Sequence, residues 1–333
     1  MSQTLAPEPA GVAPRELALS RIDTRRRILS AAAIWIVLAV LIVFASLVSD
    51  VFLTPRNLTV ILKQAAPLGI LAVGETIVLL TGGIDLSVAS VMATASIFAA
   101  GISNGSDEHV WPVILLCLTF STLVGFGNGL LVTKLKIPPF IATLGMILVV
   151  QGVRFVYSKG TPKSLVPPTL REWGQGSSGP IPNSVIIWVA IVIVVTFVLS
   201  RTTFGRRLYA VGGNARAAYL SGVSVDGVKI AAYTICSFLA GIAGLVLVGY
   251  VNAADNWLGN GYELNAIAAV VIGGTAFEGG KGSQIGTVAG VLILTVLFTL
   301  VLLLQFDESV RRIIKGVAIL LAAALYARLR TRR

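Results

Sequence analysis

Apolar stretches long enough to cross a membrane follow one another along most of this chain. A helix needs about 20 apolar residues to span the hydrocarbon core of a bilayer. Only 12% of the 333 residues are charged, which is about half the share of an ordinary soluble domain, and the mean hydropathy is +0.88. The candidate spans are 29–49, 62–80, 85–102, 111–133, 139–157, 184–200, 228–250, 263–274, 284–304 and 309–327. The sequence therefore predicts an all-α integral membrane protein with about ten transmembrane helices.

Two of these candidates differ from ordinary spans. The stretch 263–274 is too short to cross alone and ends in Gly273-Gly274, and 85–102 begins at a glycine-rich break. Helices that stop inside a membrane are tolerated where protein buries them or where they line a cavity. We expect each to be a short or broken helix, or, for 263–274, one that continues into its neighbours.

The membrane domain covers 29–327 and leaves a tail at each end. Residues 1–28 are rich in Pro, Ala and Arg and lack an apolar period, which predicts a disordered tail, and 328–333 form a short basic tail. The arginines at 25–27 resemble the start of a signal peptide. Because 29–49 is long enough to span and no convincing cleavage site follows it, we expect a retained first span.

Basic residues gather on one side of the predicted topology. The connections on the same side as the termini hold seventeen Lys and Arg residues, and the opposite connections hold six. Lys and Arg are enriched in cytoplasmic loops. Both termini are therefore predicted to lie in the cytoplasm. One missed span would invert the downstream alternation and remove most of this bias.

The segment Thr81-Gly82-Gly83-Ile84-Asp85-Leu86-Ser87 places an acid and two glycines between apolar stretches. Asp85 stands where a helix begins, and a carboxylate there can accept hydrogen bonds from free N–H groups. Acids at membrane depth face protein, water or a ligand, and carboxylates can accept hydrogen bonds from hydroxyl-rich solutes. Two interpretations stay open, a translocation path and a structural turn. The candidates are Glu75, Gly82, Gly83, Asp85 and Ser87, with Asn128 and Gln151 as further polar residues in spans.

A second stretch resembles the first. Val78-Leu79-Leu80-Thr81-Gly82-Gly83 is similar to Val270-Val271-Ile272-Gly273-Gly274-Thr275, and each precedes a span rich in small residues. Transporters are often built from repeats around a site at the midplane, which adds Gly273 and Gly274 to the candidates. The chain has 34 glycines, so chance similarity is an equally good explanation.

A short helix is predicted inside the cytoplasmic connection 201–229. Asn214 is a good N-cap and Gly222 a good helix stop, which predicts an alanine-rich helix over about 214–222. Its small apolar residues could insert into a groove on a partner protein, although an ordinary capped loop helix has the same pattern. The candidate contact residues are Asn214, Ala217, Ala218, Leu220, Ser221 and Gly222.

Several other functions are disfavoured. Cys117 and Cys236 lie inside apolar spans and His109, the only histidine, lies in a short loop, so no metal or catalytic set is expected. The net charge of +11 comes without zinc-ligand spacing or a basic stripe with aromatics, which argues against nucleic-acid binding. Gly279-Gly280-Lys281-Gly282-Ser283 lacks the spacing of a phosphate-binding loop. An ATP-driven function would therefore need a separate ATPase, and we expect no cofactor.

Four segments in order resemble the permease subunit of the ribose-type sugar importers of the ATP-binding cassette (ABC) superfamily. They are Gly82-Gly83-Ile84-Asp85-Leu86-Ser87, Pro139-Phe140-Ile141-Ala142-Thr143-Leu144-Gly145, Gly213-Asn214 to Gly222, and Gly273-Gly274-Thr275 through Gly286-Thr287. The resemblance runs from about residue 60 to 325. It implies a pathway formed by two permease subunits, which in the simplest case are two copies of the same chain in a homodimer, embedded in the lipid of a bacterial inner membrane.

The same resemblance implies two soluble partners. A cytoplasmic ATPase would drive transport, with the helix 214–222 as the coupling helix, and a periplasmic binding protein would deliver a monosaccharide or polyol. Ala89, Glu75, Glu278 and Ala215-Arg216 depart from the family pattern, and the first two flank the most specific segment, so the sugar is not identified. A secondary transporter driven by an ion gradient, with Glu75 and Asp85 as protonation sites, is the alternative. An intramembrane enzyme is the weakest hypothesis.

Overall fold

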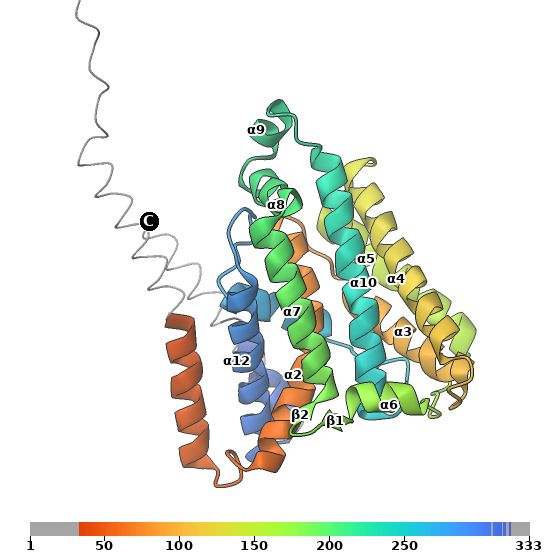
Figure 1. The fold of residues 1–333 in the computed structure, drawn as a ribbon, viewed down its shortest axis with the longest axis vertical. Coiled ribbons are helices and arrows are strands. Elements are labelled where there is room, and N and C mark those ends of the chain that lie inside the picture. Colours follow the sequence, from red (N-terminus) through yellow and green to blue (C-terminus); the bar gives the residue numbers. More distant parts are fainter. Residues whose placement is uncertain (1–32, 308, 315, 318–319, 321–333) are drawn as a thin grey trace, which may run out of the picture.

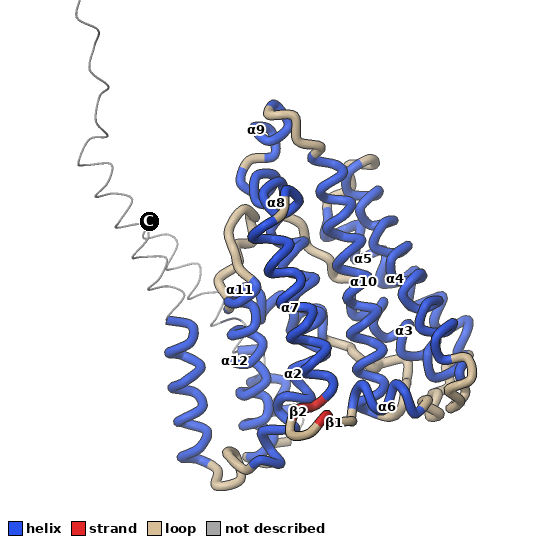
Figure 2. Tube along the Cα trace, viewed as in Figure 1, coloured by secondary structure: helices blue, strands red, loops and turns tan. Residues whose placement is uncertain are grey.

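The structure is a computed structural model that describes residues 33–307, 309–314, 316–317 and 320. Long helices dominate the described part (Figures 1 and 2). Six of them are long and apolar enough to cross a membrane, and three shorter apolar helices accompany them. The long helices are α2 (Pro55–Leu80), α4 (Val110–Thr133), α5 (Pro139–Ser158), α7 (Asn183–Arg201), α10 (Val225–Val251) and α12 (Gln284–Leu303). The shorter apolar ones are Ala33–Val48, α3 (Val88–Ser103) and α11 (Tyr262–Ile272).

Helix α2 is the centre of the bundle. Its 26 residues extend about 39 Å at 1.5 Å per residue, which is more than the hydrocarbon thickness. It packs against α7, α10, α11 and α12, and every residue from Ala65 to Leu80 is buried. Helices α4, α5 and α7 are far more exposed, as expected for helices that face lipid or another protein.

Short segments gather at the two ends of the bundle. One end carries α6 (Pro168–Gly174) and the strands β1 (Ser177–Ser178) and β2 (Ile181–Pro182), which pair antiparallel. The backbones of Lys163 and Ala254 exchange two hydrogen bonds, which joins the loops after α5 and α10 at this end. The opposite end carries α8 (Thr203–Gly213) and α9 (Ala215–Leu220), which lie at the top of Figure 1.

Most predicted spans correspond to helices, with different ends. Helix α2 begins seven residues before the predicted 62, because Thr54 caps it through the Asn57 N–H and Pro55 follows as its first residue. The prediction of a short eighth helix is confirmed, since α11 has only 11 residues. The first span is described from Ala33, most of 309–327 lies outside the described residues, and so do both predicted tails.

The two long connections contain more structure than the sequence indicated. The connection 158–183, which is predicted to be extended chain because of its five prolines, contains α6 and the β1–β2 pair. Helix α8 was missed in the connection 201–229. Thr202 caps α8 through the Gly205 N–H, and α8 buries Leu208 and Val211. Arg201 lies just before α8, and two further arginines lie within its 11 residues. The segment therefore contains no long apolar stretch that could have predicted a helix.

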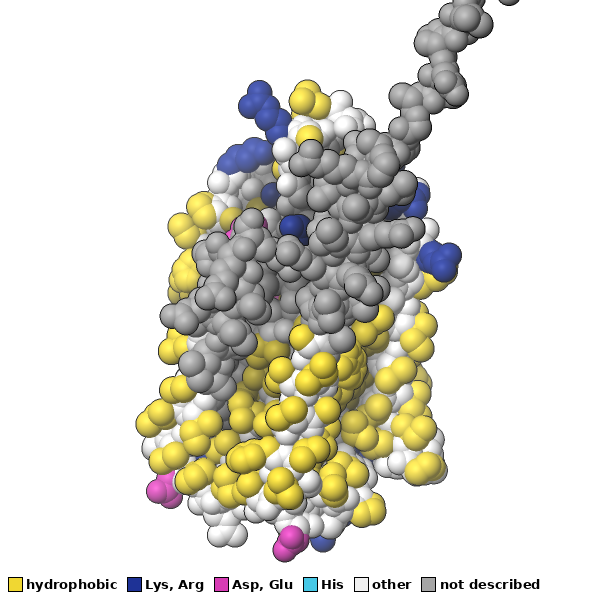
Figure 3. All heavy atoms as spheres, turned by 90° about the vertical axis from the view of Figure 1, so that its left-hand side faces the viewer, with side chains coloured by type: hydrophobic (Ala, Val, Ile, Leu, Met, Phe, Trp, Pro, Cys, Tyr) yellow, Lys and Arg dark blue, Asp and Glu magenta, His cyan; other side chains and the backbone are white. Residues whose placement is uncertain are grey.

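The surface shows which part of the bundle suits a membrane. In the face drawn in Figure 3, apolar side chains cover the middle and lower parts, and Lys and Arg side chains gather at the end that carries α8 and α9. Acidic side chains are seen at the opposite end in this view. This distribution is typical of a membrane protein whose basic end faces the cytoplasm.

Candidate functional site

The Asp85 carboxylate joins three parts of the bundle. Oδ1 accepts hydrogen bonds from the backbone N–H of Ser87 at 2.9 Å and from its hydroxyl at 2.6 Å. Asn128 of α4 donates from Nδ2 to both carboxylate oxygens at 3.4 Å, and the Ser237 hydroxyl of α10 donates to Oδ2 at 3.4 Å. Asp85 therefore holds the loop before α3 against α4 and α10.

Glu75 of α2 completes this cluster from the other side of the loop. Its Oε1 accepts from the backbone N–H of Asp85 at 3.2 Å, and Cys236 Sγ lies 3.7 Å from Oε2. Glu75, Asp85, Ser87 and Asn128 have no exposed surface. Buried polar groups are stable only when hydrogen-bonded. In this conformation the cluster connects helices and is closed to solvent, which is the geometry of a structural turn.

The two similar stretches end their helices in the same way. After α2, the N–H of Gly83 bonds to the Val78 carbonyl and that of Gly82 to the Leu79 carbonyl. After α11, Thr275 bonds to Val270 and Gly274 to Val271. This is the Schellman pattern, which requires a residue with positive φ, and Gly82 (φ 76°) and Gly274 (φ 88°) provide it. The sequence similarity therefore reflects a shared helix ending, and Gly273 is the residue that follows α11.

Helix α8 connects this region to the basic end of the bundle. A Cβ at Gly212 would collide with the Leu80 carbonyl oxygen and the Gly280 N–H, which are hydrogen-bonded to each other at 2.9 Å. The Tyr209 hydroxyl donates to the Gly282 carbonyl at 2.9 Å, and burial raises the pKa of this phenol. Helix α8 thus lies directly on the C-terminal end of α2 and on the loop before α12.

Helix α9 extends beyond α8 as the outermost element. Asn214 caps it by accepting from the Ala217 N–H at 3.0 Å, and Gly222 ends it with φ 80°. Ser221, the C-cap residue, bonds back to Ala217. Ala218 and Leu220 were both candidate contact residues, but Ala218 is buried, whereas Leu220 is 78% and Tyr219 70% exposed. Ala217, Tyr219 and Leu220 therefore form the outer surface of α9, which we call the α9 tip.

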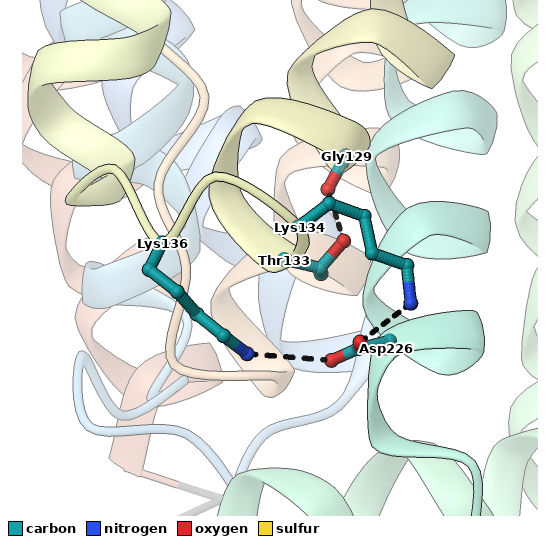
Figure 4. A network of polar contacts seen from close by, with 5 residues as sticks. All are labelled: Gly129, Thr133, Lys134, Lys136 and Asp226. Carbon is teal, nitrogen blue, oxygen red and sulfur yellow. Dashed lines mark hydrogen bonds and ion pairs between the residues drawn. The ribbon is translucent and has the colours of Figure 1, made fainter.

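A second contact at the same end joins α4 and α10. Figure 4 shows Lys134 and Lys136, which follow α4, directed toward Asp226 in the first turn of α10. Lys134 Nζ lies 2.8 Å from Oδ2 and Lys136 Nζ lies 4.0 Å from Oδ1. An acid is favoured in the first turn of a helix. These three charged side chains are partly or largely exposed to solvent, in contrast to the buried Asp85 cluster.

Gln151 is not part of the buried cluster. It lines a separate cavity between α3, α5 and the loop before α11, together with Arg154, Asn256, Trp257, Asn260 and Glu263. None of these five residues, which line the cavity with Gln151, was selected as a site candidate from the sequence. A basic residue inside a span is a signal of function and could have identified Arg154, whereas the grouping depends on the fold.

Comparisons with known proteins identify the family. Residues 57–323 match the family described as branched-chain amino acid transport system / permease component. The chain belongs to this permease family. It is similar to the ribose import permease protein RbsC of Bacillus subtilis (39% identical, covering 86% of this chain and 90% of the relative). It is also similar to the fructose import permease protein FrcC of Rhizobium meliloti (33%; 89% and 85%) and the galactofuranose transporter permease protein YtfT of Escherichia coli (38%; 78% and 76%). No solved structure matches.

Membership of this family explains why the sequence indicated a permease subunit that depends on a separate ATPase. The chain is a multi-pass membrane permease subunit of a bacterial ABC importer and is not itself catalytic. Such a permease implies an ATPase and a binding protein as partners.

Proposed function

We propose that this permease forms the translocation path of an ATP-driven importer for a monosaccharide or small polyol. The relatives named above are import permeases for ribose, fructose and galactofuranose. Each is matched over three quarters or more of its length, so the similarity covers the membrane domain as a whole. This similarity is the observation that carries the proposal.

The α9 tip is the proposed contact with the ATPase. Tyr219 and Leu220 are large apolar side chains that are mostly exposed at the basic end of the bundle (Figures 1 and 3). An exposed apolar helix can insert into a groove on a partner. Because α8 lies on the C-terminal end of α2 and on the loop before α12, movement of α9 would be transmitted to the centre of the bundle. In this arrangement both termini lie in the cytoplasm.

Two copies of the permease form the proposed path. Only 22% of the apolar window of α5 is buried within one chain. Apart from neighbouring residues of α5 itself, no atom of the described residues lies within 4 Å of a Cβ placed at Gly145 or Gly152. Small residues on an open helix face permit close packing of a second helix in a membrane. A homodimer in which α5 approaches the partner would place the path between the subunits.

Reconstitution tests the function directly. The complete transporter, consisting of the permease, its ATPase and its binding protein, is placed in proteoliposomes, and uptake of labelled D-ribose, D-fructose and D-galactose is measured. We expect uptake of at least one sugar that requires ATP and the binding protein. As a control, the permease alone is given a proton gradient without ATP. Accumulation in that control would contradict the proposal and favour a secondary transporter.

A further inference from the structure

A polar cavity of about 100 Å³ opens beside α3 and α5, away from the buried Glu75–Asp85 cluster. At about 10–15 Å³ for each water-sized sphere, it holds on the order of eight such spheres. Its walls come from the first turns of α3, the second half of α5, the loop after α10 and the start of α11. The loop after α10 joins the loop after α5 through Lys163 and Ala254. The cavity is therefore closer to the α6 end than to the α9 end.

Polar atoms in the cavity walls lack partners among the described residues. Arg154 is 4% exposed, and although its Nη1 donates to the Ser90 carbonyl at 3.2 Å, its Nε has no partner. Oε2 of Glu263 is likewise buried without one. A buried polar group without a hydrogen bond is destabilising. Two such groups lining one cavity indicate a ligand that provides the missing donors and acceptors.

The composition of the cavity indicates the chemistry of this ligand. Arg154 offers only donors and Glu263 acceptors, while Gln151, Asn256 and Asn260 offer both. One cation and one anion balance each other at the walls, so a neutral solute fits better than an ion. Trp257 and Leu86 add apolar surface. A few polar groups on an apolar lining are typical of a small-molecule site.

We propose that this cavity is a weak binding site for a neutral polyhydroxylated solute on its way into the permease. The proposal rests on the sugar-import function proposed above and assigns part of the path to α3, α5 and the loop before α11. A site on a transport route must bind weakly enough to release its cargo. The small volume of the cavity, which limits the contacts that a solute can make, agrees with that requirement.

A cysteine in the cavity wall provides the test. Ala89 lines the cavity, and the two native cysteines have no exposed surface. Ala89→Cys is introduced into the permease, which is reconstituted with its ATPase, and the rate of modification by a small membrane-impermeant thiol reagent is measured. The probes are D-ribose, D-fructose and the acid D-gluconate at high concentration. Ala93→Cys serves as a second reporter in case Ala89→Cys does not assemble, and Thr161→Cys, outside the cavity, is the control.

We expect a neutral sugar to slow modification of the cavity cysteine and to leave Thr161→Cys unaffected. Adding Gln151→Ala or Asn260→Ala should weaken this protection about two- to tenfold, the effect of one lost hydrogen bond. Asn265→Ala, on α11 but outside the cavity lining, should not. Protection by gluconate alone would overturn the assignment to a neutral solute.

The wild-type transporter separates this inference from the function on which it rests. If it takes up a probe sugar with ATP but that sugar protects neither cavity cysteine, the site is refuted and the function stands. If it transports none of the sugars, the proposed function fails first.

Discussion

At the scale of single residues, two aspartates show how burial changes the importance of an acid. Asp85 has no exposed surface and accepts hydrogen bonds from a backbone N–H, two hydroxyls and an amide. The side chain of Asp226 is 35% exposed and contacts two lysines, whose side chains are 58% and 77% exposed. A surface ion pair contributes about 0–1 kcal/mol. A buried donor that loses its acceptor is destabilised by about 1–3 kcal/mol.

Asp85→Ala should therefore destabilise the permease far more than Asp226→Ala. Removing the Asp85 carboxylate leaves buried donors on Ser87 and Ser237 unpaired, whereas Asn128 keeps its 2.8 Å hydrogen bond to the Ser87 hydroxyl oxygen. We expect a loss of about 2–4 kcal/mol, against less than about 1 kcal/mol for Asp226. Thermal unfolding of each purified variant in the same detergent measures the difference. Asp85→Asn keeps one acceptor oxygen and should lie between them. Equal melting temperatures for Asp85→Ala and the wild type would refute a structural role.

The residues of the buried cluster were easier to predict than those of the cavity. An acid within an apolar stretch is conspicuous, so Glu75, Asp85 and Asn128 could be selected from the sequence. The contacts of Asp85 with Glu75, Asn128 and Ser237 join positions 10, 43 and 152 residues apart, which only the packing of α2, α4 and α10 determines. In the cavity, Asn256 and Asn260 come from a loop whose composition is ordinary for a surface turn, so their position depends on the fold.

At the scale of elements, α9 shows how a helix of one or two turns can be both fixed and exposed. Its N-cap and its Schellman ending satisfy the terminal backbone groups, and the buried Ala218 anchors it. Within the part of the chain that the structure describes, Tyr219 and Leu220 of the α9 tip remain mostly exposed. A large exposed apolar surface in a folded protein usually marks an interaction site.

Leu220→Glu should uncouple the permease from its ATPase while the permease still folds. The side chain is 78% exposed, so the change leaves the packing intact but places a charge in the proposed apolar contact, and we expect sugar-stimulated ATP hydrolysis to fall about tenfold or more. Leu135→Glu makes the same change at an exposed site on the same end of the bundle, outside α9, and should have little effect. Normal stimulation in Leu220→Glu would remove the coupling role from α9.

Elements were predictable where one physical signal sufficed. Length and apolar composition located the long helices, and Asn214 and Gly222 located α9. Helix α8 and helix α6 were missed because each is short and amphipathic or polar, and each is held by contacts with other elements, such as that of Gly212 with Leu80 and Gly280. The hairpin of β1 and β2 is only two residues per strand, which is below the length at which an alternating pattern can be recognised.

At the scale of the whole molecule, the two ends of the bundle differ in their basic residues, and this difference predicts how the bundle is oriented in the membrane. The loops after α3, α5 and α10 meet at one end, where Gly105 contacts Leu165 and Lys163 bonds to Ala254. The loop after α4, α8 and the start of α10 lie at the other end, with the basic residues Lys134, Lys136 and Arg206. The physical reason for orientation is the retention of Lys and Arg on the cytoplasmic side.

Reporter fusions can test this direction at three points. Fusions after Gly105 and Gly176 should be active only with a periplasmic reporter, and a fusion after Gly213 only with a cytoplasmic one, because α4, α5 and α7 each reverse the direction of the chain between these points. Gly105 and Gly176 are separated by two long helices and should agree with each other, which is an internal control. A cytoplasmic result at Gly176 would mean that α4 or α5 does not cross. Reversal at all three points would place the α9 tip outside the cell, where no ATPase could reach it.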